Sequence, residues 1–176
     1  MQNITIRRAT TNDVELISTL GSTTFYDTFS GTCTIADMNF VLDKFFNKNQ
    51  VAQELNDEKD FFFIAFDDSG KALGYYRMKL QHDHPFDALN NFNSIELKRL
   101  YCISEAKGKG VAKALMNHAF EFAIEKGYNK MYLSVWEYNI RAQEFYKKMG
   151  FETTGIENDF PLGTTPQTDF WFWKNL

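Results

Sequence analysis

The stretch LYCISEAKGKGVAKAL, residues 100–115, passes from an apolar run through a glycine-containing turn into a helical pattern. Glycine lets the backbone turn tightly and lets a ligand approach the main chain closely. The first amides of a helix that begins near Gly110 have no acceptors inside that helix, and the helix dipole favours negative charge. The segment therefore predicts a pyrophosphate site, to which Lys107, Lys109 and Lys113 add positive charge.

Two well-known phosphate-binding loops do not fit this segment. A Walker A loop requires Gly-Lys followed by Ser or Thr, whereas Val111 follows Gly110. The dinucleotide fingerprint requires a third glycine where Lys113 stands. On this segment alone, an ordinary helix start with flexible glycines remains the alternative.

The surrounding periodicity predicts how the rest of the chain is organised. Alternating and continuous apolar runs predict strands, and apolar residues spaced by three and four predict helices. The unit 95–136 reads as strand, turn, helix and strand, which places two parallel strands side by side through a right-handed crossover. We expect strands over 4–8, 61–66, 73–80, 95–103, 131–136, 153–157 and 169–173, a hairpin turn at 67–70, a loop over 82–93, and helices that start at 10–12, 34 and 51 and that span 110–126 and 139–149.

Length and composition limit the classes of protein. The 176 residues, 44% of them hydrophobic, predict one domain over 1–176, and the net charge of −4 argues against nucleic-acid binding. No apolar stretch is long enough to cross a bilayer and no secretory signal is visible, so we expect no membrane contact and a cytoplasmic location. Cys33 and Cys102 are expected to be reduced thiols. His82 and His84 have no further Cys or His nearby, so we expect a polar loop and no metal.

Two motifs in series carry a family resemblance. KGKGVA, residues 107–112, resembles the (Gln/Arg)-x-x-Gly-x-(Gly/Ala) signature of the GNAT acetyltransferases. NIRAQEFYKKMGF, residues 139–151, resembles the Asn-x-x-Ala-x-x-Phe-Tyr-x-x-x-Gly-Phe motif of the same superfamily. The resemblance implies an α/β fold (α+β in some schemes): a mixed, mostly antiparallel twisted sheet with helices on both faces and strands that splay apart at the cofactor site.

A narrower resemblance points to the acceptor. The segments 24–29, 61–64, 135–137 and 145–151 look like those of PaiA-type polyamine acetyltransferases. Lys107 and Ser104 depart from the Gln or Arg and the Pro that many relatives have at these positions. Lys107 keeps a donor but lacks the fork of a guanidinium. The resemblance implies acetyl-CoA as the donor and a primary amine as the acceptor, with spermidine or spermine as the first choice.

The same resemblance assigns a cofactor site. The end of the strand at Tyr101, Cys102 and Ile103 is expected to pair its backbone with the pantetheine arm, as an added strand would. Asn139 matches the family position that hydrogen-bonds the CoA arm, and Lys148 is expected to reach a CoA phosphate. The pyrophosphate would be held by Gly108, Lys109, Gly110, Val111, Ala112 and Lys113.

Catalytic roles also follow from the resemblance. Tyr146 matches the family's general acid: a phenol with a pKa of about 10 is protonated at pH 7 and can give its proton to the thiolate that leaves the tetrahedral intermediate of direct attack. The ammonium acceptor must first lose a proton, and Glu96 is the first candidate base. The acceptor site is expected to include Phe25, Tyr26, Asp27, Trp136 and Glu137, of which Glu137 is also the second candidate base.

Other functions stay open on the sequence alone. The enzyme alternative is acetylation of a protein N-terminus or a lysine, and the alternative of another class is a CoA-binding sensor without catalysis. The partners expected are a small-molecule amine and, through the aromatic segment 170–173, a second copy of the chain in a homodimer. The exact amine, the identity of the base, the oligomeric state and any regulatory role are not fixed by the sequence.

Overall fold

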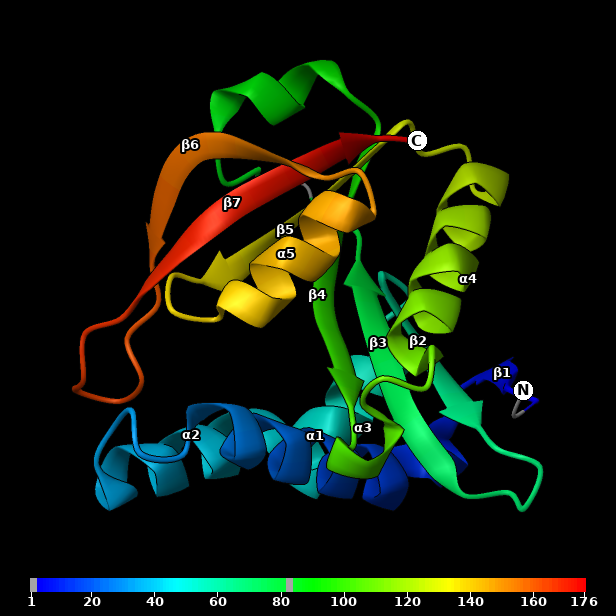
Figure 1. The fold of residues 1–176 in the computed structure, drawn as a ribbon, viewed down its shortest axis with the longest axis vertical. Helices are drawn as coiled ribbons and strands as arrows, with labels where there is room; N and C mark the ends of the chain where they lie inside the picture. The colour runs from blue at the N-terminus through cyan, green and yellow to red at the C-terminus, as the bar shows by residue number, and fades with distance from the viewer. Residues whose placement is uncertain (1–2, 82–83) are drawn as a thin grey trace.

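A computed structural model describes residues 3–81 and 84–176. The described strands form one sheet in the order β1-β2-β3-β4-β5-β7-β6, in which only the β4–β5 pair is parallel (Figure 1). The strands are β1 (Thr5–Arg8), β2 (Asp60–Phe66), β3 (Ala72–Lys79), β4 (Ser94–Cys102), β5 (Lys130–Trp136), β6 (Glu152–Asp159) and β7 (Thr168–Asn175), and the helices are α1 (Val14–Phe29), α2 (Ile35–Phe46), α3 (Lys48–Asn56), α4 (Val111–Glu125) and α5 (Ile140–Lys148).

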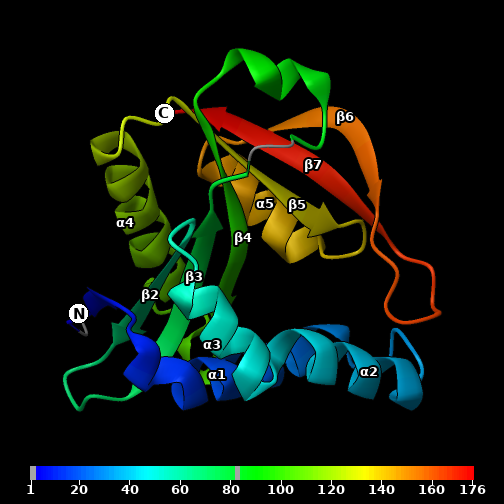
Figure 2. The same ribbon diagram turned by 180° about the vertical axis from the view of Figure 1, so that it is seen from behind.

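Helices cover both faces of the sheet, as predicted. Successive side chains of a strand point to opposite faces, and β2 illustrates this alternation. Phe62 and Ile64 pack in a cluster with residues of α1 and α3, whereas Phe63 and Ala65 belong to the cluster that contains Leu115 of α4. Figures 1 and 2 show α4 and α5 on one face and the layer of α1, α2 and α3 on the other.

The sheet opens between β4 and β5, which confirms the expected splay. Their parallel pairing covers only Ser94–Glu96 of β4. At the point where this pairing stops, β4 carries a β-bulge: Leu97 pairs with Met78 and Arg99 pairs with Arg77, so Lys98 is an extra residue. A bulge bends its strand and re-aims the side chains that follow. After Glu96, the backbone of β4 therefore no longer pairs with β5.

The bulge also decides which residues of β4 face which layer. Without it, Glu96 and Tyr101 would point to opposite faces, because five positions separate them. With it, Glu96 pairs with Lys79 and Tyr101 with Tyr75, both on the face of β3 that α1 and α3 cover. One extra residue thus brings Glu96 and Tyr101 to the same face.

The predicted strands and helices are present, with small shifts. The hairpin turn at 67–70 joins β2 and β3 as predicted. Within the predicted loop 82–93, Asp87–Asn91 form a 3-10 helix whose Leu89 is buried, and Phe86 packs against Trp171. Phe86 and Leu89 thus tie this segment to the core. The polar residues around them in the sequence led to the prediction of a loop. His82 lies outside the described residues, and His84 faces the ring of Tyr132.

The aromatic segment 170–173 lies inside the sheet. β7 pairs with β5 along one edge and with β6 along the other, so the backbone of this segment is already engaged on both sides. Trp171 and Phe172 are buried. A dimer formed by adding a strand of a second copy to β7 is therefore sterically excluded. In the part of the chain that the structure describes, no helix has the length and apolar character that crossing a bilayer requires.

Candidate active site

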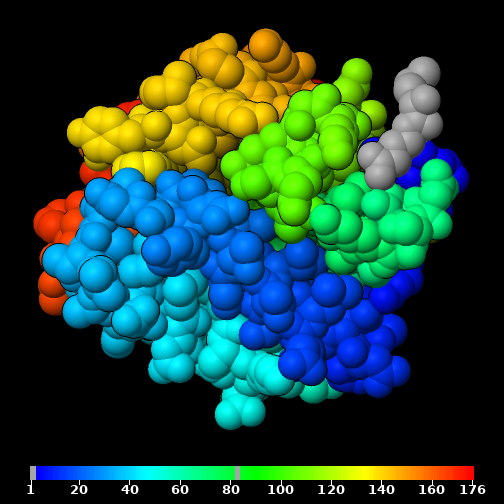
Figure 3. Space-filling model, turned by 60° about the horizontal axis from the view of Figure 1, so that its bottom comes forward, coloured from blue at the N-terminus to red at the C-terminus, as the bar shows by residue number. Residues whose placement is uncertain are grey.

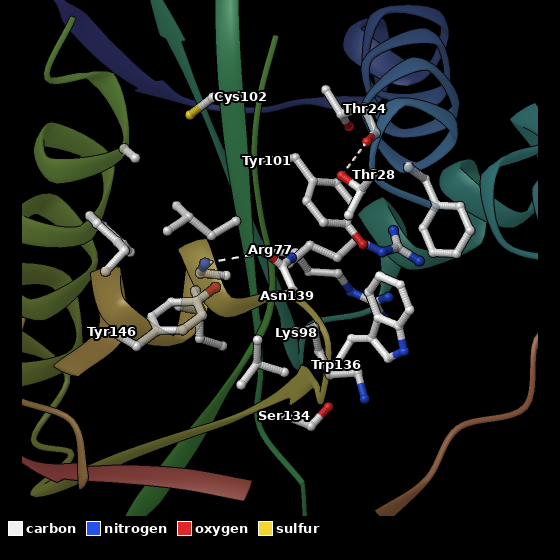
Figure 4. A pocket seen from close by; sticks show the side chains of 18 of the residues that line it. Thr24, Thr28, Arg77, Lys98, Tyr101, Cys102, Ser134, Trp136, Asn139 and Tyr146 are labelled. Atoms are coloured by element: carbon white, nitrogen blue, oxygen red, sulfur yellow. Dashed lines mark hydrogen bonds between the residues drawn. The ribbon is translucent and has the colours of Figure 1, made fainter. Parts of the chain in front are cut away.

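A cavity of about 990 Å³ lies where β4 and β5 diverge. It is lined from both faces of the sheet, by Val111 of α4 and Tyr146 of α5 on one and by Phe25 of α1 and Glu54 of α3 on the other. Figure 3 shows the surface on which α1 and α2 (blue) adjoin α4 and α5 (green to yellow). In Figure 4, Tyr146 lies on one side of the pocket and Trp136 and Arg77 lie on the other. The cavity therefore gives two different molecules access to the same gap.

The loop before α4 forms one end of the cavity. Gly110 is the residue before the first helical turn, with a φ of 83°, and Gly108 has a φ of 79°. These left-handed conformations favour glycine. A Cβ at either position would meet no other atom within 4 Å, so the space beside the loop is open. The start of α4 has no side-chain cap, which leaves its first amides as donors for an anion. The residues present fit the pyrophosphate of CoA.

Asn139 and α5 form the adjoining wall. Asn139 caps α5: its side-chain oxygen accepts a hydrogen bond from the amide of Ala142 at 3.2 Å. The side-chain NH₂ group is therefore the part of Asn139 that can donate to a molecule in the cavity. Gln143 anchors the segment before α5, because its side-chain nitrogen donates to the carbonyl of Glu137 at 2.8 Å. Capping and anchoring together fix the orientation from which α5 presents Tyr146.

Tyr146 of α5 brings a hydroxyl group to the side of the cavity that α4 and α5 line. Its ring packs edge-on against Phe145 and Phe151, at interplanar angles of 63° and 68°, with ring centres 5.5 and 5.8 Å away. Burial, together with the nearby Tyr101 and Cys102, raises the pKa of the Tyr146 phenol well above its usual value. Burial likewise raises the pKa of the Cys102 thiol to about 12. Both groups are therefore protonated at neutral pH, which makes Tyr146 a proton donor rather than a base.

Aromatic rings line the half of the cavity that faces α1 and α2. Phe25 and Phe29 stack with ring centres 4.4 Å apart, and Phe29 lies 5.1 Å from Trp136. The ring of Phe46 lies 6.4 Å from that of Tyr101. Faces of aromatic rings attract cations and bind apolar chains. This wall suits an acceptor with an alkyl stem and a positive charge.

A buried charge network also lines this half of the cavity. Both carboxylate oxygens of Glu54 accept from arginines: one from Arg77 at 2.7 Å, the other from Arg99 at 2.8 Å. Asp60 binds Arg77 through two hydrogen bonds of 2.8 Å. Burying any of these charges alone would be costly, whereas the paired set is satisfied. The network therefore serves as a rigid support that joins α3 to β3 and β4.

Two further carboxylates line the same half. Glu96 accepts from Lys98 at 2.9 Å through one oxygen and from Gln81 through the other. Asp169 lies on β7 and accepts from the hydroxyl of Ser134 at 2.7 Å. Burial raises the pKa of Asp169 to about 6, against the opposing effects of the Ser134 hydrogen bond and the charge of Lys98.

We call the half of the cavity with the aromatic wall the acceptor half, because Phe25 and Trp136 are predicted to bind the acceptor there. The loop between β6 and β7 adds Phe160 to the lining of the cavity and is tied to α2. Asp37, in the first turn of α2, accepts from the amide of Thr164 at 2.7 Å and from the hydroxyl of Thr165 at 2.8 Å. These bonds, and a third from Thr34, lower the pKa of Asp37 to about 2. Leu162 of the same loop is buried against α2. The loop is therefore fastened by charge-assisted hydrogen bonds and by apolar packing.

The cavity brings together most of the residues predicted for the cofactor and some of those predicted for the acceptor. Ile103, Lys109 and Lys148 are not among the described residues that line it, and the Ile103 amide donates to the carbonyl of Leu73 at 3.0 Å. Tyr26, Asp27 and Glu137 also lie outside its described lining. Among the predicted site residues, the lining includes Phe25, Glu96, Tyr101, Cys102, Gly108, Gly110, Val111, Ala112, Lys113, Trp136, Asn139 and Tyr146.

Asp27 has a different partner. It accepts a hydrogen bond of 3.0 Å from the hydroxyl of Ser104, so it links α1 to the loop that precedes α4. Sequence reasoning missed Glu54, Arg77, Arg99 and Asp169. The available signal for Asp169 was a single acidic residue at the start of an otherwise aromatic strand, 169–173. A charge in that position requires a buried partner or a function.

Comparison with known proteins agrees with this geometry. The acetyltransferase (GNAT) family pattern matches residues 24–151. An uncharacterized N-acetyltransferase of Lactobacillus delbrueckii subsp. lactis, from the pepI 3' region, is 32% identical over 180 residues, which cover 100% of this chain and 99% of that protein. The uncharacterized N-acetyltransferase Rv2669 of Mycobacterium tuberculosis is 31% identical over 119 residues, 68% of this chain and 69% of that protein.

A solved structure shares the fold. The crystal structure of the PaiA N-acetyltransferase from Thermoplasma acidophilum in complex with coenzyme A superposes with a TM-score of 0.78 at 22% identity, covering 99% of each chain. The seven-stranded, mostly antiparallel sheet that is open between β4 and β5 is thus the GNAT fold. With its family pattern, its relatives and its fold in agreement, the chain belongs to the GNAT family of N-acetyltransferases.

Proposed function

We propose that the protein transfers the acetyl group of acetyl-CoA to the primary amine of a small cationic acceptor, with a polyamine such as spermidine or spermine as the first candidate. The observation that supports this most is the cavity that passes through the sheet at the β4–β5 gap. One half presents the glycine loop, Asn139 and Tyr146, and the other presents the aromatic wall and the carboxylates. Donor and acceptor would meet in the gap.

Acetyl-CoA supplies an activated acyl group as a thioester when it is bound. The amides of Gly110 and of the first turn of α4 would hold its pyrophosphate, and the unpaired edge of β4 at Tyr101 and Cys102 would align its amide-containing arm. Lys107 and Lys113, both in the cavity wall, add positive charge for the phosphates. These contacts orient the reacting carbon relative to Tyr146.

Tyr146 would act in the second half of the reaction. Direct attack of the amine forms a tetrahedral intermediate, and its collapse releases a thiolate that needs a proton. Because burial keeps the Tyr146 phenol protonated, its O–H bond is intact when the thiolate forms. The proton passes to sulfur, and the phenolate recovers one from the new ammonium nitrogen. Glu96 stays a predicted base, although each of its carboxylate oxygens already accepts a hydrogen bond.

The acceptor half favours a small substrate. The loop between β6 and β7 adds Phe160 to its lining and is held by Asp37 and by the packing of Leu162, and the rings of Phe25, Phe29 and Trp136 form its wall. An alkyl ammonium can lie along such rings through cation–π attraction. Acetylation of a protein N-terminus or a lysine would require a groove for a peptide, so it is the second candidate. We also propose the cytoplasm as the location, because acetyl-CoA is plentiful there.

A turnover assay tests the proposal. Release of CoA is measured with acetyl-CoA and a panel of spermidine, spermine, shorter diamines, a monoamine and a lysine-containing peptide. We expect turnover with the small amines and a lower kcat/KM for the peptide. Absence of CoA release with every amine, while acetyl-CoA binds in calorimetry, would instead support a sensor without catalysis. A preference for the peptide would support the second candidate.

A further inference from the structure

Three carboxylates line the described wall of the cavity, and they differ in their partners: Glu54, Glu96 and Asp169. Glu54 is paired with two arginines, and Glu96 is paired with Lys98 at 2.9 Å. Asp169 accepts a hydrogen bond from Ser134 and, within the described residues, forms no ion pair with a lysine or arginine. A positively charged acceptor would therefore find one buried carboxylate without a cationic partner.

The position of Asp169 follows from strand register. It pairs with Trp136 of β5 and with Asn158 of β6, and residues paired across a sheet point to the same face. Ser134 and Trp136 are two positions apart on β5, so both point to that face, and both line the cavity. Asp169 therefore stands beside the aromatic wall of the acceptor half.

We propose that Asp169 is the catalytic group that binds the acceptor ammonium and takes its proton before attack. This inference rests on the proposed function. The transfer breaks one N–H bond of the ammonium and forms the O–H bond of the Asp169 carboxyl, which leaves a neutral amine with its lone pair available. The C–N bond then forms, the C–S bond breaks, Tyr146 protonates the sulfur, and its phenolate regains a proton from the acylated nitrogen. The Asp169 proton returns to water after the product leaves.

The charge balance of the pocket suits this transfer. A free alkyl ammonium has a pKa of about 10.4, so producing the neutral amine at pH 7 costs about 4.6 kcal/mol in water. A buried carboxylate that binds the ammonium and can accept its proton lets the abundant charged form of the acceptor bind and react, and a pKa of about 6 leaves Asp169 ionised at pH 7 for this role. The titratable and charged groups around it are Lys98 and Tyr101 of β4, and Lys98 is paired with Glu96; β5 and β6 present the neutral Ser134, Trp136 and Asn158.

The test compares pH profiles of kcat/KM for the wild type and for Asp169→Asn, whose side-chain oxygen can still accept from Ser134. For a strongly basic amine, we expect the wild-type profile to rise to about pH 6 and then stay level. The variant should lose about 10²- to 10⁴-fold at pH 7, and its rate should rise tenfold per pH unit because only neutral amine reacts. Asp159→Asn removes the charge of an exposed residue of β6 and serves as the matched control, with an unchanged profile.

A weakly basic acceptor shows whether Asp169→Asn impairs proton transfer or disturbs the packing of the site. Trifluoroethylamine is largely neutral at pH 7, so Asp169→Asn should acetylate it within a few-fold of the wild-type rate. An equal loss for both amines, or a level profile in the variant, would overturn the role of Asp169. So would a Glu96→Gln variant that alone acquires the tenfold rise per pH unit. Wild-type protein that acetylates no amine would overturn the proposed function as well, whereas the other outcomes leave that function standing.

Discussion

The two halves of the cavity are built in different ways. The donor half consists of one loop, the end of one strand and two helix starts, all within residues 100–146, and it offers mainly backbone groups. The acceptor half collects side chains from α1, α2, α3, β3, β4, β5, β6 and β7, which are far apart in the chain. The donor half therefore depends on local conformation, and the acceptor half depends on tertiary contacts. Mutations in the acceptor half should accordingly reduce stability, and mutations in the donor half should reduce the affinity for acetyl-CoA.

The largest effect is expected at the junction of the halves, at Tyr146. Tyr146→Phe removes the proton donor but keeps the ring that packs on Phe145 and Phe151. We expect kcat to fall by about 10²- to 10⁴-fold, while the affinity for acetyl-CoA in calorimetry changes little. Unchanged turnover would show that the leaving thiolate takes its proton from elsewhere. Weakened acetyl-CoA binding would make Tyr146 a binding residue for the donor rather than its proton donor.

A stability defect should mark the acceptor half. Glu54→Gln leaves Arg99 buried without its anion and removes one of the two carboxylates that pair with Arg77, which should cost about 3–5 kcal/mol in the free energy of unfolding measured with urea. The control is Glu15→Gln, because Glu15 pairs with Lys48 on the exposed surface, and it should have little effect. If the two variants were equally stable, the network would not be the support of the acceptor wall.

The donor half should instead respond to backbone strain. Alanine at a φ of 83° is strained by about 1–2 kcal/mol, so Gly110→Ala should weaken acetyl-CoA binding by roughly 5- to 30-fold as the loop shifts. Gly70, in the β2–β3 hairpin, has a φ of 82° and equally open surroundings. Gly70→Ala is therefore a matched control that carries the same strain but should leave the dissociation constant unchanged. Equal affinities in both variants would remove the glycine loop from the binding site.

The smallest effect concerns the loop between β6 and β7. The folded protein lowers the pKa of Asp37 to about 2, below its ordinary value of 3.8, so Asp37 contributes stability above about pH 4 that is lost as the pH falls towards 2. Asp37→Asn should have a lower melting temperature than the wild type at pH 6, and the difference should shrink at pH 2.5. A difference independent of pH would mean that shape, not charge, fastens the loop.

The same contrast explains what could be read from the sequence. The order of elements, the crossover at 95–136 and the glycine loop depend on local patterns, and they were predictable. The acceptor half was not, because Glu54, Arg77 and Arg99 meet only through strand register and helix packing. Asp27 looked like part of an aromatic acceptor site, but α1 turns it towards Ser104. Its direction is set by how the helix packs, which neighbouring residues in the sequence do not reveal.

The paired residues of β4 that follow the bulge at Lys98 do not tolerate a change in their number. Deleting a paired residue such as Leu100, which lies opposite Tyr76, would shift Tyr101 and Cys102 by one position along β3, so that these two side chains would exchange layers. A one-residue insertion in the turn at 67–70 would change only a solvent-exposed bend. Homologous enzymes should accordingly vary in the lengths of their hairpins while the number of residues between Arg99 and Gly110 stays constant. New acceptor specificities should then arise without a change in the length of this segment.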